Sequence, residues 1–411
     1  MKICFVVQRY GVEFVGGAER YVRAMAGGLA AEGHDISVVT SCATSYHDWA
    51  DEYPAGSVLD EGVVVHRLPV TAPRDNERFI PLHLRAVDVH QPPLWPWAQE
   101  RWSQLMGPDL QDGPAVVARA AATHDVTILV GYHYSQTMRL TLPAAAFGPT
   151  IVIPTAHPEG AFHVGRVGAM FEHADHVISL APEEAELIRR TYDAAPQISV
   201  VGCPVDPIVA PSEAEIDAAV AAVGARRGRY AIVVGRVDPA KGSDDAIRFT
   251  QLYRRNIDPD FELVVVGPGG DGARTDGVRS TGFVDEATKN ALIAGSGVLL
   301  QPSYMESFSL ALMEGWLLGR PALVQRRSEV LAGHAERSGG GLTYGDYLDF
   351  EAAMVLLTGS PDISARLGRA GCDYVEREYA WDHVRSGFLH VASGVAEVNG
   401  RTVERAGRVL G

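Results

Sequence analysis

Short apolar runs alternate with stretches of helical periodicity through the first half of the chain. The run KICFVVQ (residues 2–8) is typical of a buried parallel strand, and the apolar residues between 18 and 29 recur at helical spacing. Further strands are predicted at DISVVTS, VVVHRLPV, DVTILVG, TIVIPTA and HVISLAP, and helices around Met170 and over residues 183–192. This β–α–β alternation predicts a parallel, doubly wound sheet.

The alternation is interrupted near the middle of the chain and then restarts. Residues 202–228 include CPVDP and a polar, alanine-rich stretch, and predict a linker with one helix. Strands are then expected at RYAIVVG, FELVVVG, GVLLQPS and PALVQ, with a helix over DDAIRFTQLYRR. The fold class is therefore α/β: two doubly wound, Rossmann-like domains, residues 1–205 and 206–379, facing each other across a cleft. Ligands of such sheets lie beyond the carboxyl ends of the strands.

A proline- and tryptophan-rich segment, residues 76–106, follows neither period. It includes QPPLWPWAQERW, and we expect a long loop or short helices inserted in the first domain. Some insertions of this kind carry function, and others only pack on their domain.

Composition and charge narrow the classes of function. The formal net charge is −15 and no run is rich in lysine or arginine. This argues against a nucleic-acid surface and against strong docking on anionic lipid, but leaves room for weak membrane association. The four cysteines are far apart and form no CxxC pair, as in a reducing compartment. The N-terminus turns polar too soon for a signal peptide, and no apolar run of about 18 residues occurs. We therefore expect a cytoplasmic protein without a transmembrane segment.

The loop VVGRVDPAKG (residues 233–242) suits an anionic ligand. A strand is predicted to end at Gly235, Arg236 follows, and Lys241 stands at the start of a helix. Helix N-termini favour anions, and a guanidinium fork beside an ammonium matches a diphosphate. The alternative is a solvated surface loop that happens to carry two cations.

Two other patterns fail on context. Gly267, Gly269 and Gly272 satisfy the dinucleotide fingerprint GxGxxG, but no amphipathic helix follows them, so we interpret them as a glycine-rich turn. The DPD at residues 258–260 matches the DxD of some metal–nucleotide sites, but it precedes a strand, at the end opposite the expected cleft. No histidine–carboxylate cluster has the spacing of metal ligands, so no metal is expected.

Two glutamates interrupt the apolar stretch PSYMESFSLALMEGWLLGRPALV (residues 302–324). Glu306 is predicted in a loop after a strand, and Glu314 about two turns into a helix that begins around Phe308. Both carboxylates can then point into one cleft and accept hydrogen bonds from the hydroxyls of a sugar or a ribose. The alternative is a helix-start charge and a surface residue. The first-turn N–H groups available to a phosphate would be those of Phe308, Ser309 and Leu310.

In this order, the glycine-containing first loop, the Arg–Lys pair and E-x7-E resemble the retaining glycosyltransferases of family 4, which have the GT-B fold. The likeness extends from GGAERYV at residue 16 to EYAW at residue 378 and is strongest at residues 235–242 and 302–319. It implies transfer of a sugar from a UDP- or GDP-sugar to an acceptor glycan, lipid or small molecule. Such a reaction belongs to surface-glycan, glycolipid or natural-product glycoside biosynthesis, and no cofactor is expected besides the nucleotide sugar as co-substrate.

The resemblance also implies roles for individual residues. Glu306 would contact the hydroxyls of the donor sugar and Glu314 the ribose, while Arg236 and Lys241 would hold the diphosphate. His157, after the strand TIVIPTA, matches the active-site histidine of the family, and catalysis is expected to depend on it together with Arg236, Lys241 and Glu306. The other expected donor contacts are Gly16, Gly17, Gly235, Gly267, Phe283, Val284, Phe308, Ser309 and Leu310.

One departure from the family concerns that histidine. The family often carries an acidic residue directly after it, whereas Pro158 and then Glu159 follow here. Whether a carboxylate orients His157 is therefore open. A final helix, about residues 380–398, is expected to pack back on the first domain. The acceptor is expected on that domain, where the candidate contacts are Tyr10, Trp95, Trp97, Trp102 and His133.

Other functions stay open at this point. The same fold hosts sugar-nucleotide epimerases and hydrolases, which change the donor without an acceptor. An NAD-linked oxidoreductase would use the glycines at residues 267–272. A nucleotide-sugar sensor would bind the donor without turnover.

Overall fold

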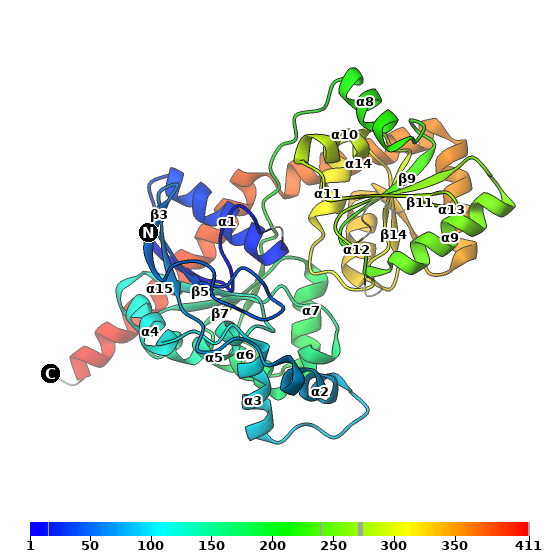
Figure 1. Cartoon of the computed structure of the whole chain (residues 1–411). Helices are drawn as coiled ribbons and strands as arrows, with labels where there is room; N and C mark the ends of the chain where they lie inside the picture. The colour runs from blue at the N-terminus through cyan, green and yellow to red at the C-terminus, as the bar shows by residue number, and fades with distance from the viewer. Residues whose placement is uncertain (15, 239–240, 270–273, 410–411) are drawn as a thin grey trace. The chain divides into compact units, whose positions relative to one another are not determined.

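The chain forms two compact units. The computed structural model describes residues 1–14, 16–238, 241–269 and 274–409, with 274–275 and 399–409 described through the backbone alone. The first unit comprises Met1–Pro204 and Val384–Gly411, and the second comprises Val205–His383 (Figure 1). Each unit is built around its own sheet.

A doubly wound sheet forms the centre of the first unit. Within the described residues it has eight strands in the order β3-β4-β2-β1-β5-β6-β7-β8, all neighbours parallel except β3 and β4. The chain moves outward from β1 in one direction and from β5 in the other, so the topological switch point lies between them. The strands are β1 (Lys2–Val6), β2 (Asp35–Ser41), β3 (Gly56–Asp60), β4 (Val63–Leu68), β5 (Val126–Val130), β6 (Thr150–Ile153), β7 (His176–Ser179) and β8 (Ile198–Val200).

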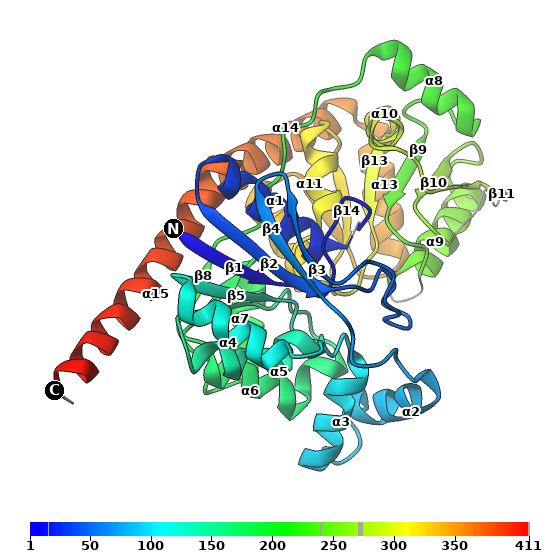
Figure 2. The same ribbon diagram turned by 60° about the vertical axis from the view of Figure 1, so that its left-hand side comes forward.

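Helices cover both faces of this sheet. Successive apolar side chains of its central strand point to opposite faces, and both sets are buried. Cys4 and Val6 of β1 pack into a cluster with residues of α4 and α5. Phe5 points to the opposite face and stacks on Phe388 of α15, with ring centroids 6.0 Å apart. Figure 2 shows α15 passing beside the N-terminal strand. The helices are α1 (Gly17–Ala31), α4 (Gly113–Thr123), α5 (Ser135–Ala145), η1 (Gly160–His163), α6 (Gly165–His173), α7 (Pro182–Thr191) and α15 (Trp381–Val409).

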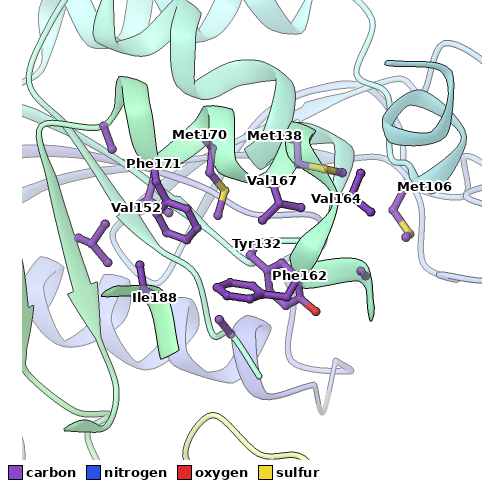
Figure 3. Close-up of a cluster of buried hydrophobic side chains, with 14 of the residues drawn as sticks. Met106, Tyr132, Met138, Val152, Phe162, Val164, Val167, Met170, Phe171 and Ile188 are labelled. Atoms are coloured by element: carbon purple, nitrogen blue, oxygen red, sulfur yellow. The ribbon is translucent and has the colours of Figure 1, made fainter. Parts of the chain in front are cut away.

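The proline- and tryptophan-rich segment forms two short helices, α2 (Asn76–Val87) and α3 (Pro96–Met106), so the expectation of short helices is confirmed. Trp102 of α3 is fully buried, and its Nε1–H donates to Nδ1 of His83 in α2 at 3.3 Å. It belongs to a hydrophobic cluster that continues through Phe162 (Figure 3). Trp102 therefore anchors the insertion to the body of the first unit.

The second unit repeats the doubly wound arrangement. Its seven strands, counted over the described residues, lie in the order β11-β12-β10-β9-β13-β14-β15, with only β11 antiparallel to its neighbour. Helices α9 and α13 cover one face, and α11 and α14 cover the other (Figure 1). The strands are β9 (Tyr230–Val234), β10 (Glu262–Val266), β11 (Arg274–Thr275), β12 (Val278–Gly282), β13 (Val298–Gln301), β14 (Ala322–Gln325) and β15 (Gly341–Tyr344). The helices are α8 (Glu213–Val223), α9 (Ser243–Asn256), α10 (Glu286–Gly295), α11 (Leu310–Leu317), α12 (Glu329–Ser338), α13 (Tyr347–Gly359) and α14 (Pro361–Glu378).

The switch point of the second sheet lies between β9 and β13. Strands β10 and β12 extend the sheet on one side of this pair, and β14 and β15 extend it on the other. The predicted α/β class with two doubly wound sheets is confirmed. The loops with candidate chemistry follow β9 and β13, at the two strands where such folds bind ligands.

Candidate active site

The loops after β9 and β13 bring a cation and a carboxylate together. Lys241 Nζ lies 2.9 Å from Glu306 Oε1, and the lysine side chain is 42% exposed against 16% for the glutamate. Gly242 permits this approach of the two loops, since a Cβ there would lie 2.1 Å from the carbonyl oxygen of Pro302. Two of the predicted site residues therefore meet at the switch point of the second sheet.

Arg236 lies at the same edge. It follows Gly235, whose φ of 148° favours glycine, and its Nη2 lies 3.2 Å from Asp238 Oδ2. The Ser243 hydroxyl, at the start of α9, accepts from the Asp238 N–H at 2.9 Å and shapes the turn. Residues 239 and 240 of this loop lie outside the described part of the chain. Arg236 and Lys241 thus both lie in the loop that leads into a helix, whose beginning favours an anion.

The glycines after β10 form a turn against the neighbouring loop. Gly267 has a φ of 146°, and a Cβ there would lie 2.1 Å from the carbonyl oxygen of Gly235. Gly269 has a φ of 95°, and Gly272 lies outside the described residues. The elements described next along the chain are the strands β11 and β12. A dinucleotide fingerprint would open a helix here, so the interpretation as a turn fits the structure.

The DPD motif lies at the opposite edge of the second sheet, as predicted. Residues 258–260 precede β10 and are separated from it by Phe261. Asp258 pairs with Arg229 at 2.8 Å and Asp260 with Arg226 at 3.3 Å. These carboxylates are therefore engaged with arginines, away from Lys241.

Phe283 and Val284, two of the expected donor contacts, follow β12 at the same edge as Lys241. The Gly267 N–H donates to the Gly282 carbonyl oxygen at 2.9 Å and ties this segment to the turn after β10. Phe283 is 73% exposed, and Val284 is half-buried.

Backbone strain marks the junction of the β13 loop with α11. Ser309 has a φ of 84°, in the left-handed region that residues other than glycine rarely adopt. Gln301, at the end of β13, donates from Nε2 to Ser309 Oγ at 2.6 Å. The prediction that the helix begins around Phe308 is wrong by two residues, because a left-handed Ser309 cannot belong to its first turn. Phe308 instead buries its ring edge-on against His334.

Glu314 is buried, and its partner is a residue that the sequence did not single out. Lys289 Nζ of α10 lies 2.9 Å from Glu314 Oε2, and the two side chains are 10% and 8% exposed. Lys289 also reaches Glu286 at 2.7 Å. Because Leu292 and Ile293 are buried three and four positions further along α10, Lys289 lies on its apolar face. A lysine on the apolar face of α10 is the feature of the sequence that could have revealed this ion pair.

The loop after β1 holds a second buried ion pair that the sequence did not reveal. Arg9 donates from Nε and Nη2 to Glu19 Oε1 at 3.0 and 2.6 Å. Gly16 lies against this carboxylate, since a Cβ there would be 2.2 Å from Glu19 Oε2. A Cβ at Gly17 would meet nothing within 4 Å. Packing in the structure therefore explains the glycine at position 16 and does not explain the one at position 17. Tyr10 is 2% exposed and packs inside the unit, which corrects its expected role as an acceptor contact to one of packing.

His157, after β6, lies beside a carboxylate. Glu159 Oε1 is 3.8 Å from His157 Nδ1 and accepts a hydrogen bond from the Tyr132 hydroxyl. Burial opposes ionisation of Glu159, but His157, His133 and the Tyr132 hydroxyl outweigh it and lower the pKa of the carboxyl group. An acidic residue therefore stands next to the histidine although Pro158 follows it in sequence.

The candidate acceptor contacts differ widely in exposure. Trp95 and Trp97 are 75% and 74% exposed, so both rings are accessible. Trp102 is fully buried and offers no face to an acceptor, which corrects its expected role to one of packing. His133 meets the ring of Tyr132 edge-on, and burial lowers the pKa of its imidazole to about 4, so this histidine is neutral at pH 7.

Two features are absent from the described part of the chain. It contains no group of three or more histidine, cysteine, aspartate or glutamate residues that could hold a metal ion. None of its helices has both the length and the apolar character needed to cross a membrane.

Solved structures share this two-domain architecture. Sucrose-phosphate synthase from Thermosynechococcus elongatus has a TM-score of 0.65 at 17% identity, and the match covers 99% of both chains. Alr3699/HepE from Anabaena, in complex with UDP and glucose, has a TM-score of 0.64 at 14% identity, over 97% of this chain and 100% of that one. At these identities the likeness shows the fold, which is the GT-B fold of glycosyltransferases.

The chain belongs to family 4 of the glycosyltransferases. The family model described as "Glycosyl transferase 4-like domain" matches residues 16–204, and the one described as "Glycosyl transferases group 1" matches residues 228–358. Glycogen synthase of Mycobacterium tuberculosis (strain ATCC 25618 / H37Rv) is 25% identical over 419 residues, 95% of this chain and 94% of that protein. The resemblance inferred from the motifs is confirmed.

Proposed function

We propose that this glycosyltransferase moves a sugar from a nucleoside-diphosphate sugar, a UDP- or GDP-sugar, to an acceptor with retention of anomeric configuration. The observation that carries the proposal is the Lys241–Glu306 pair, 2.9 Å apart at the switch point of the second sheet. It combines a cation for the phosphates with an acceptor for sugar hydroxyls. Similarity to a protein solved with UDP and glucose supports this class of donor.

Each donor group has a candidate partner in the second unit. Lys241 and Arg236 would hold the diphosphate at the start of α9, where the helix dipole adds to their charge. Glu306 would accept hydrogen bonds from the sugar hydroxyls. Glu314 would accept bonds from the ribose, with Lys289 holding its carboxylate in place.

In the first unit, Gly17 and His157 would lie nearest the donor. The open space at the Cβ position of Gly17 suits close approach of a phosphate or sugar to the backbone. His157 would lie beside the transferred sugar. Glu159, held by Tyr132, would take the place of the acidic residue that the family often carries directly after this histidine.

The chemistry of the site supports same-face attack with retention over a double displacement. A double displacement needs a carboxylate nucleophile about 5 Å from a second acid–base group. Glu306 and Glu314 are assigned to hydroxyls, and Glu159 is bonded to Tyr132. Same-face attack, with the leaving phosphate accepting the proton of the acceptor, needs no such nucleophile. The protein would then contribute positioning and stabilisation of charge on an oxocarbenium-like state.

Two measurements test the proposal. Thermal-shift screening of UDP-, GDP-, ADP- and dTDP-sugars should identify one base that stabilises the protein, and NAD should not. The anomeric proton coupling of the product by NMR should then match that of the donor. An α-linked donor that gives a β-linked product would exclude retention and make His157 a general base. A donor sugar altered without an acceptor would indicate an epimerase or hydrolase instead.

A further inference from the structure

The turn that carries His157 is strained and is held by a buried carboxylate. Thr155 has a φ of 52°, a left-handed conformation that is costly for a β-branched residue. The next backbone N–H, that of Ala156, donates to Glu184 Oε1. Glu184 lies in the first turn of α7 and is 1% exposed. A carboxylate on α7 is thus bonded to the residue directly before His157.

The same carboxylate also binds the loop after β7. Glu184 Oε2 accepts from the Leu180 N–H at 2.6 Å and from the Ser179 hydroxyl at 3.1 Å. Three bonds join the ends of β6 and β7 to the start of α7. A buried carboxylate is costly to desolvate, and an apolar residue would fill the same space without that cost. The bonds to the turn therefore point to a role beyond packing.

We propose that Glu184 is a positioning residue for glycosyl transfer. Through the Ala156 N–H it holds Thr155 in its strained conformation and so keeps His157 in place. The proposal rests on the role of His157 beside the donor sugar that is proposed above.

Glu184 also makes this arrangement sensitive to pH. Burial raises the pKa of its carboxyl group to about 7, although the bonds from Leu180, Ala156 and Ser179 oppose the shift. Tyr21 of α1 is a titratable group coupled to it: burial, Cys203 and Glu184 keep the pKa of this tyrosine well above its usual value. Below about pH 7 a proton turns one acceptor oxygen of Glu184 into a hydroxyl donor, and the bonds to the turn weaken.

Glu184→Gln isolates the bond to Ala156. The glutamine carbonyl oxygen can take the place of Oε2, which accepts two hydrogen bonds. The amide NH2 then takes the place of Oε1 and faces the Ala156 N–H, and since both groups are donors this bond is lost. We expect kcat to fall by roughly 10- to 100-fold, the scale of a misplaced active-site group, with donor affinity unchanged. Hydrogen exchange of the Ala156 amide should accelerate. Glu186→Ala, at an exposed position of the same helix, should match the unmodified chain in both measurements.

A double-mutant cycle separates positioning from general stability. If Glu184 acts through His157, Glu184→Gln should cost little further activity in a His157→Ala background. In the unmodified chain kcat should fall below about pH 7 as Glu184 takes up a proton, and this acidic limb of the kcat–pH profile should be absent from Glu184→Gln. The proposal would be overturned if the effects of the two substitutions on kcat were fully additive, or if the acidic limb persisted in Glu184→Gln. A chain that transfers no sugar from any donor would refute the proposed function; an active chain unaffected by Glu184→Gln would refute only this inference.

Discussion

Replacing Lys241 with alanine should separate donor binding from stability. The ammonium group pairs with Glu306 at 2.9 Å, yet the lysine side chain is 42% exposed. An ion pair with so exposed a partner contributes roughly 0–1 kcal/mol to folding. For a domain of this size, that corresponds to a melting temperature lowered by at most about 4 °C.

Donor affinity should fall much further. A charge-assisted hydrogen bond to a phosphate is worth about 1.5–3 kcal/mol, which is roughly a ten- to hundredfold change in Kd. Removing Lys241 also leaves the carboxylate of Glu306 beside the diphosphate without its neutralising partner. The expected loss therefore lies toward the upper end of that range.

Isothermal titration calorimetry with the donor found by thermal shift measures the effect directly. Arg227→Ala is the matched control, because its side chain is 41% exposed, is also ion-paired, and precedes β9 at the opposite edge of the sheet. Unchanged affinity in Lys241→Ala, or an equal loss in Arg227→Ala, would remove the β9 loop from the donor site.

Other substitutions probe the rest of the site. Lys289→Met should lower the stability of the second unit by up to about 3 kcal/mol, since it removes a cation 2.9 Å from the buried carboxylate of Glu314, and calorimetric melting should show a shift of up to roughly 12 °C. Replacing Trp95 and Trp97 with alanine should raise the acceptor KM and leave donor affinity intact, because both rings are exposed. His157→Ala should lower kcat without abolishing it, since no essential proton transfer is lost. Turnover should survive excess EDTA, because cationic side chains and a helix N-terminus can neutralise the leaving diphosphate.

Each of these expectations has a contrary result. Unchanged melting in Lys289→Met would mean that solvent already screens the pair. Lower donor affinity with unchanged acceptor KM would move the Trp95 and Trp97 surface away from the acceptor. Complete loss of activity in His157→Ala would indicate a general base. Activity lost in EDTA and restored by magnesium or manganese would show that a metal takes part.

The sequence predicted most reliably those features that depend on order along the chain. Alternating strands and helices determine which loops follow which strands, and the strand order of a doubly wound sheet then brings the loops of β9 and β13 together. The proximity of Lys241 and Glu306 could therefore be expected before either loop was seen. The failure of GxGxxG could also be expected, because it depends on the element that follows.

Features that depend on the direction of a side chain could not be predicted in the same way. Trp95, Trp97 and Trp102 look alike in sequence, but only the packing of α3 reveals that Trp102 is the buried one. Glu184 reads as an ordinary first-turn carboxylate of α7, since its bond to Ala156 joins residues 28 positions apart. The left-handed Ser309 has no signature either, because its strain is maintained by Gln301 across the β13 loop.

The stacking of Phe5 on Phe388 has a consequence for synthesis on the ribosome. Strand β1 acquires its covering helix α15 only after the intervening second unit has been synthesised, and Arg385, paired with Glu32 at 3.0 Å, also emerges after that unit. The second unit is continuous in sequence and can fold as soon as it emerges, whereas the part of the first sheet that α15 covers stays exposed until then. The nascent first unit thus keeps the apolar surface around Phe5 exposed while the second unit is being made, and a chaperone that binds apolar segments would protect it during that interval.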